Sequence, residues 1–315
     1  MKNYIAEKIT DPRKKRKKLK AGDVQLLLLT LPAILFFVVF HYIPMFGVVI
    51  AFKDYSYSKG IFGSKWVGFK NFEFFFKSQD AWLLTRNTVG YALLFLVVGT
   101  IAAVVVALLL NEISNRHMIK LYQTSMILPY FLSWVIVSYI TYILLNPNLG
   151  MLNQIMKAFG LEEVNWYSEK KYWPLFLTIV NVWKGIGMNS IFYYATLLGV
   201  DPGLYEAAKI DGASRFQRMI YVSLPSLIPT ITILTILSLG SIFRGDFGLF
   251  YQIPRNVGIL YPVTDVIDTY IYRGLRFGDV SITAAVGLFQ SFVGMVAVVV
   301  TNWIVRKTNP DNAMF

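Results

Sequence analysis

The sequence predicts an all-α integral membrane protein with six membrane-spanning helices, and three observations support this fold class. Of the 315 residues, 56% are hydrophobic and only 15% are charged, whereas charged residues make up about 25% of a typical soluble domain. The charged residues cluster between long apolar runs. Six of these runs are long enough to cross the hydrocarbon core as helices, which takes about 20 residues each.

The apolar runs also predict the domain organisation. We expect spans at 24–51, 83–110, 119–145, 174–199, 223–244 and 280–304. The first run is too long for a cleaved signal peptide, and no small-residue cleavage site follows it. The expected parts are therefore a basic tail over 1–23, a six-span domain over 24–305 with a polar loop at 200–222, and a second tail over 306–315.

The distribution of Lys and Arg predicts that both termini are cytoplasmic. The first tail contains the basic run at 13–18, and the short links after the second and fourth spans are also basic. The opposite loops are much longer and less densely basic, so the positive-inside rule places the tails and the polar loop in the cytoplasm. The basic run is either a topology signal alone or an anchor to anionic lipid, where each cation contributes about 1 kcal/mol.

The composition excludes several functional classes. The chain has no cysteine, which rules out disulfides, thiol catalysis and cysteine metal sites. His41 and His117 are too far apart for metal-ligand spacing. The net charge of +12 does not indicate a nucleic-acid partner, because the basic residues lie at loop ends and in the tail.

Two stretches of the outer loops suit helices that lie in the membrane interface. WVGFKNFEFFF at 66–76 and IDTYIYRGLRFGD at 267–279 both combine aromatic residues with lysine or arginine. Either helix could dock an external partner, although interfacial packing alone explains both.

The loop between the fourth and fifth spans contains a polar helix. In VDPGLYEAAKIDGASRFQRMIYVSLP, at 200–225, Asp201 is a good N-cap and Pro202 occupies the first helical position. Ala208 and Gly212 lie one turn apart and leave a face without bulk. Charged residues border that face: Glu206, Lys209, Asp211, Arg215 and Arg218. Glycine within a helix costs about 1 kcal/mol, so we expect Gly212 at a corner between two short helices that dock another protein.

The spacing in this loop resembles a known family. Glu206-Ala207-Ala208, three residues, Gly212, nine residues and then Val222-Ser223-Leu224-Pro225 is similar to the EAA loop of binding-protein-dependent ABC importer permeases, although the family pattern has Ile where this chain has Val222. The stretches FHYIPMFGVVIAFKDY, LLLNEISNR, LPYFLSWVIV and VTDVIDTYIYRGL resemble the carbohydrate branch of the LplB type. That branch is linked to polysaccharide and oligosaccharide uptake and includes alginate-oligosaccharide permeases.

The resemblance implies one permease half of an ATP-driven oligosaccharide importer in a bacterial cell membrane. The implied partners are a second homologous permease subunit in a heterodimer, two ABC ATPase subunits, an extracytoplasmic solute-binding protein, an oligosaccharide and membrane lipid. The helix at 203–217 would seat in a groove on an ATPase subunit. The coupling residues implied are Tyr205, Glu206, Ala207, Ala208, Asp211, Gly212 and Arg215. The chain lacks a G-x-x-x-x-G-K-[ST] loop, so ATP and Mg²⁺ are expected on the ATPase partner, and this chain is expected to be non-catalytic with no cofactor or metal.

Polar and aromatic residues within the spans predict the substrate path, because a charge at the membrane centre costs about 2.5–3.5 kcal/mol and is kept for a reason. The candidates are Tyr130, Trp134, Asn181, Lys184, Met188, Ser238 and Arg244. In permeases that this chain resembles, substrate contacts lie on the spans before and after the EAA loop, which favours Asn181, Lys184, Met188 and Ser238. Lys184 and Arg244 could bind the carboxylates of an acidic sugar such as a uronate. Alternatively, Lys184 pairs internally and Arg244 pairs with Asp246.

Three other classes of protein explain the sequence less well. A secondary sugar carrier driven by an ion gradient is expected to have interrupted helices in two related halves, and no internal repeat is visible. A membrane enzyme would need a nucleophile–base pair or a metal cluster, and neither pattern occurs. These two, and a purely structural membrane subunit, leave the EAA pattern unexplained.

Overall fold

The computed structural model describes residues 21–308, most of them helical, in two units, Met1–Val49 and Ile50–Phe315. The first unit contains α1 (Ala21–Phe37), a π-helical turn η2 (Val38–Tyr42), α2 (Ile43–Met45) and the start of the 3₁₀ helix η3 (Phe46–Phe52). An apolar helical stretch at Leu27–Phe52 is long enough to span a membrane, as expected for the first span. Most of the expected basic tail lies outside the described residues.

The second unit contains long apolar helices joined by short ones. In chain order the elements are β1 (Lys53–Asp54), α3 (Gly60–Gly63), β2 (Lys65–Trp66), α4 (Lys70–Lys77), α5 (Gln79–Asn111), α6 (Arg116–Phe131), α7 (Trp134–Leu145), α8 (Met151–Ala158), η4 (Lys170–Tyr172), α9 (Trp173–Leu198), α10 (Pro202–Ile210), α11 (Arg215–Arg218), η5 (Met219–Ser223), α12 (Leu224–Leu239), α13 (Phe247–Gln252), η6 (Gly258–Leu260), α14 (Tyr261–Thr264), α15 (Ile267–Phe277) and α16 (Val280–Thr308). The antiparallel pair β1–β2 is a small departure from the all-α prediction. The helices α4 and α15 form where interfacial helices are expected.

The third predicted span is not one helix. The expected segment 119–145 consists of α6 and α7, which are bent by 98° at the break between them. Pro129 lacks an N–H donor, and Leu132 leaves the helical conformation with ψ of 135°. The hydroxyl of Ser133 then caps α7 by accepting a hydrogen bond from the Ile136 N–H at 3.3 Å. The described residues therefore contain five continuous spans, and six if the bent pair counts as one.

The fifth span ends earlier than predicted. The helix α12 ends at Leu239, and residues 240–246 leave it as a loop, so the expected end at 244 is wrong. Gly240 and Gly245 weaken a helix here, and the side chain of Asp246 caps the next one, α13. This difference moves Arg244 from a helix to a loop.

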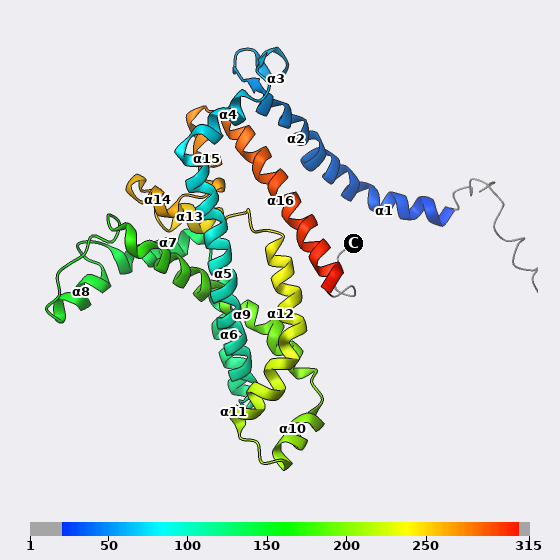
Figure 1. The fold of residues 1–315 in the computed structure, drawn as a ribbon, viewed down its shortest axis with the longest axis vertical. Helices are drawn as coiled ribbons and strands as arrows, with labels where there is room; N and C mark the ends of the chain where they lie inside the picture. The colour runs from blue at the N-terminus through cyan, green and yellow to red at the C-terminus, as the bar shows by residue number, and fades with distance from the viewer. Residues whose placement is uncertain (1–20, 309–315) are drawn as a thin grey trace, which may run out of the picture. The chain divides into compact units, whose positions relative to one another are not determined.

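The helix α9 holds the second unit together by packing against α5, α6 and α12. Small residues on α5, such as Ala103 and Ala107, lie in one buried cluster with Tyr193, Tyr194 and Leu197 of α9. Figure 1 shows α10 and α11 at one end of this unit and α4 and α15 at the opposite end. The long helices thus separate the polar loop from the outer loops, as the predicted topology requires.

A buried ion pair stabilises the end of this unit opposite the polar loop. The carboxylate of Asp265, 6% exposed, pairs with the guanidinium of Arg273 and accepts a hydrogen bond from the Thr269 hydroxyl at 2.5 Å. The Asn87 amide of α5 donates to the Asp265 carbonyl at 2.9 Å. Burial acts to lower the pKa of Arg273, but its hydrogen bond and Coulomb attraction to Asp265 outweigh burial and raise that pKa. The guanidinium therefore stays charged and ties α15 to the segment before it.

We predict that Gly187→Ala separates α6 from α9. A Cβ at Gly187 would lie 1.9 Å from the Met126 carbonyl oxygen, so the helices must move apart. Because overpacking of a tight contact costs about 1–3 kcal/mol or more, thermal unfolding of the purified protein should occur at a lower temperature. Gly90→Ala is the matched control, since a Cβ there meets no atom within 4 Å. An unchanged melting temperature for Gly187→Ala would show that α6 can shift freely.

Candidate functional site

The polar loop forms the corner that the sequence predicts. Asp201 Oδ1 accepts a hydrogen bond from the Gly203 N–H at 2.9 Å and caps α10. Gly212 adopts a φ of 80°, a left-handed conformation that favours glycine, between α10 and α11. Ser214 and Gln217 then cap α11 reciprocally. The expected helix at 203–217 is thus two short helices that meet at Gly212.

One face of α10 contacts the spans and the other is exposed. Tyr205 and Ala208 are half-buried, whereas Glu206 and Ala207 are exposed. The Tyr205 hydroxyl lies 3.0 Å from the hydroxyl of Ser223, which is 1% exposed. Ser223 ends the π-helical turn η5, which continues directly into α12. A movement of α10 is therefore transmitted to α12 through a hydrogen bond as well as through the chain.

A groove of about 410 Å³ lies beside this corner. It is lined by Asn111, Glu112, Ser114, Tyr205, Glu206, Lys209, Arg215 and Arg218. Three of the predicted coupling residues, Tyr205, Glu206 and Arg215, line the groove. The others, Ala207, Ala208, Asp211 and Gly212, belong to the same corner but not to the groove lining.

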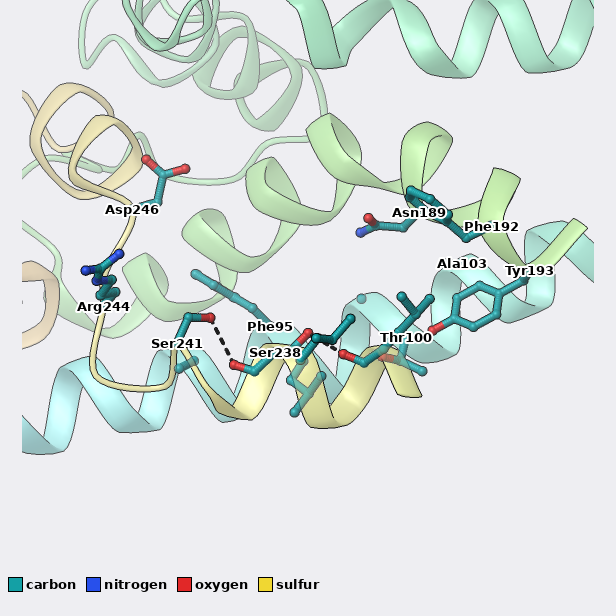
Figure 2. Close-up of a pocket in the computed structure, with 15 residues that line it drawn as sticks. Phe95, Thr100, Ala103, Asn189, Phe192, Tyr193, Ser238, Ser241, Arg244 and Asp246 are labelled. Atoms are coloured by element: carbon teal, nitrogen blue, oxygen red, sulfur yellow. Dashed lines mark hydrogen bonds between the residues drawn. The ribbon is translucent and has the colours of Figure 1, made fainter. Parts of the chain in front are cut away.

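A polar cavity of about 490 Å³ lies between α5, α9 and α12. Two of the predicted path residues, Ser238 and Arg244, line it. Figure 2 shows Arg244 and Asp246 on the loop at one end of this cavity, and Asn189 and Tyr193 towards the other end. Hydroxyl, amide and charged groups beside aromatic rings are the groups that a sugar binds.

Thr100 on α5 and Ser241 in the loop after α12 also line the cavity, and the sequence analysis missed both. Thr100 carries a detectable signal, because it is a polar residue within a predicted span. Ser241 is also a polar residue within the predicted span 223–244, but it lies in the loop after α12, because the helix ends at Leu239.

The side chain of Arg244 has no partner at hydrogen-bond distance in the described part of the chain, although its backbone N–H donates to the Ser241 carbonyl at 2.9 Å. Its expected alternative partner, Asp246, instead accepts a hydrogen bond from the Leu249 N–H at 3.2 Å through Oδ1. The ion pairs among the described residues do not include Arg244. The guanidinium donors of Arg244 therefore remain available at the cavity.

The other predicted path residues, Tyr130, Trp134, Asn181, Lys184 and Met188, do not line this cavity. Lys184 instead donates to the carbonyl oxygens of Tyr130 at 2.6 Å and Pro129 at 3.4 Å. Its ammonium lies 5.4 Å and 5.1 Å from the ring centroids of Tyr130 and Trp134. The Pro129 carbonyl also accepts a hydrogen bond from the Leu132 N–H at 3.1 Å. Because the break after α6 leaves the Tyr130 carbonyl without a helical N–H partner among the described residues, Lys184 supplies the missing donor there. Lys184 thus pairs internally in this structure.

These features define a class of protein: a multi-pass membrane protein with a polar cavity between its spans and an exposed polar corner at one end. Residues 96–310 match the model of the binding-protein-dependent transport system inner membrane component, and the chain belongs to this family.

Similar proteins include sugar permeases. The chain is 38% identical to Protein LplB of Bacillus subtilis, over 92% of this chain and 91% of that protein. It is 37% identical to the polygalacturonan/rhamnogalacturonan transport system permease protein YteP of the same species, over 94% and 92%. It is also similar to a chain of a solved bacterial ABC transporter involved in the import of the acidic polysaccharide alginate, with a TM-score of 0.82, 32% identity and coverage of 91% of this chain and 97% of that chain.

We predict that Lys184→Met destabilises the bent span, because it leaves the Tyr130 carbonyl without its donor. Loss of a hydrogen bond from a charged donor costs about 1.5–3 kcal/mol, so the melting temperature of the purified protein should fall. Lys184→Arg should restore much of the loss. Lys171→Met, which removes only a cation above the Tyr172 ring at an exposed position, is the control. Equal melting temperatures for all variants would contradict the capping role.

We predict that Tyr205→Phe loosens α10 from α12. Loss of a hydrogen bond worth about 1 kcal/mol should speed hydrogen–deuterium exchange of the α10 amides about fivefold. Ser223→Ala should have the same effect, and the double variant should add little to either. Tyr221→Phe is the control, since Tyr221 is 76% exposed. If the α10 amides exchange alike in all four variants, the hydroxyl contact does not restrain the helix.

Proposed function

We propose that this chain is one permease subunit of an ATP-driven importer of acidic oligosaccharides. The observation that carries the proposal is the position of Arg244, whose guanidinium lines a polar cavity between three spans and has no partner among the described residues. Guanidinium binds carboxylate with two parallel hydrogen bonds, which makes an acidic sugar a better fit than a neutral one. The names of YteP and of the alginate transporter support the same substrate class.

The corner at Gly212 is the proposed contact with the ATPase subunits, which would hold ATP and Mg²⁺. Its exposed face offers Glu206 with Ala207, and Ile210 is 86% exposed. Its inner face is joined to α12, whose other end reaches the cavity through Ser238. Closure of the ATPases on ATP would therefore move a helix that lines the cavity. In this division of labour the chain itself is not catalytic.

A second permease subunit is proposed to complete the path. In the most apolar 18-residue stretch of Arg215–Leu239 only 11% of the residues are buried, and in the corresponding stretch of Val280–Lys307 only 17% are. Such large exposed apolar surfaces require lipid or another protein. A homologous second subunit, paired as a heterodimer, would enclose the cavity. A solute-binding protein would dock at the end that carries α4 and α15, which is extracytoplasmic if both termini are cytoplasmic, as the basic tail favours.

An ion-gradient-driven carrier is the alternative function, and no observation on this chain favours it. The described helices show one broken span rather than a matched pair in two halves, which such carriers typically contain.

The test is oligosaccharide-stimulated ATP hydrolysis by the reconstituted complex with its binding protein. We expect Glu206→Lys to weaken ATPase binding at least about tenfold, because it reverses a charge at the docking face. Gly212→Arg should do the same, since arginine is strained at a φ of 80°. Glu162→Lys, an exposed charge reversal in the loop after α8, is the control. Uptake that needs an ion gradient but no ATP would overturn the proposal.

A further inference from the structure

The loop after α12 runs between two cavities. The first is the 490 Å³ cavity between α5, α9 and α12, and the second, of about 710 Å³, is bordered by the loop after α12 and by α15 and α16. Ser241 and Arg244 line both cavities. Volumes of this size are typical of ligand pockets, which measure about 300–1,000 Å³. The loop therefore forms the boundary between two chambers, each with polar walls.

Both neighbours of Arg244 are anchored through their backbone. The Gln290 amide of α16 donates to the Phe243 carbonyl at 2.7 Å and to Asp268 Oδ2 at 3.0 Å. The same Asp268 oxygen, on α15, accepts a hydrogen bond from the Gly245 N–H at 2.7 Å. One carboxylate and one amide thus hold the chain on either side of Arg244 but not its side chain. A guanidinium on a restrained backbone loses less entropy when it binds a ligand.

Gly245 makes this anchoring possible. A Cβ at Gly245 would lie 2.8 Å from Cγ2 of Val266 and 3.2 Å from Asp268 Oδ2. Any other residue would push the loop away from α15. The close approach is therefore a specific feature of the loop, and a single methyl group is enough to disturb it.

The carboxylates nearest Arg244 in the chain and on α15 accept hydrogen bonds from other donors. Asp268 bonds to the Gly245 N–H and Gln290, and Asp246 caps α13 through the Leu249 N–H. Burial raises the pKa of Asp268, while those hydrogen bonds and the charge of Arg244 oppose the shift. Neither carboxylate forms an ion pair with Arg244 in the part of the chain that the structure describes.

We propose that residues 243–245 form a carboxylate-selecting constriction between the two cavities, in which Asp268 and Gln290 are positioning residues for Arg244. The constriction would bind the carboxylate of a uronate residue as the sugar chain passes from the second cavity to the first. A neutral sugar of the same size would lack this contact. The inference rests on the proposed function and adds a second sugar-binding chamber and a means of selection to it.

Because this chain contains no cysteine, a single introduced thiol can be labelled without background from the chain itself. Ser241→Cys places one thiol at the wall shared by both cavities. The rates at which this thiol reacts with an anionic sulfonate thiosulfonate and a cationic trimethylammonium thiosulfonate are compared in the assembled complex, on this chain's own gel band. The rate with the anionic reagent divided by the rate with the cationic reagent reports the local charge, and a nearby positive charge raises this ratio. We expect Arg244→Gln to lower the ratio about fivefold, which corresponds to a charge effect of about 1 kcal/mol, and Arg244→Lys to preserve it.

The positioning role predicts an effect without any change of charge. Gly245→Ala and Gln290→Asn should both lower the ratio, because each moves the Arg244 side chain but does not remove its positive charge. Gly294→Ala is the control, since it adds a methyl group to the second cavity in open space. An unchanged ratio in Arg244→Gln, or in both displacing variants, would overturn the proposal.

Protection by sugars tests the selection itself. Galacturonan oligomers should slow the labelling of the Ser241→Cys variant, whereas their methyl esters and neutral galactose oligomers of equal length should not. Equal protection by acidic and neutral oligomers would overturn the constriction but leave oligosaccharide import standing. By contrast, a wild-type complex that imports no oligosaccharide on addition of ATP would overturn the proposed function itself.

Discussion

The arrangement of the spans depends on the close crossing of α6 over α9 at Gly187. Only glycine permits this distance, because a Cβ would meet the Met126 backbone at 1.9 Å. In a membrane, helices gain little from the hydrophobic effect when they associate, so close van der Waals contact between backbones contributes much of the packing energy. The crossing also brings Lys184, less than one turn before Gly187, to the Tyr130 carbonyl at the end of α6. The same contact therefore places the bend in the third span and satisfies its backbone groups.

The two ends of the second unit are built for different tasks. At one end, an exposed corner at Gly212 is attached to α12 by the chain and by the Tyr205–Ser223 hydrogen bond. At the other end, ionic and amide contacts hold α15 and the loop after α12 in place, through Asp265 with Arg273 and Asp268 with Gln290. The helix α12 joins the two ends. In the proposed mechanism, a force applied at the corner would reach the wall of the cavity through α12.

Lys184 and Arg244 illustrate how charges in similar sequence settings acquire different roles. Both are cations in or near predicted spans, and both were candidates for a sugar carboxylate. Lys184 donates hydrogen bonds to carbonyl oxygens at the end of α6, where the helix breaks, so its ammonium already has partners. Arg244 lies on a loop whose backbone is anchored on either side, so its guanidinium faces the cavities instead. The difference depends on where α6 breaks and where α12 ends, which involve residues distant in the chain.

The sequence by itself determined the membrane class, the approximate spans and the corner at Gly212. These follow from local properties: apolar length, the N-cap at Asp201, and the conformational preference of glycine. The tertiary structure alone decided that the third span bends, that Lys184 caps the bend, and that Ser241 and Arg244 are shared by two cavities. Local patterns do not encode these features, because a backbone carbonyl left free on one helix selects its donor from whichever helix packs against it. Gln290 and Asp268, which hold the loop around Arg244, lie 46 and 24 positions further along the chain, and only the packing of α15 and α16 beside that loop brings them together.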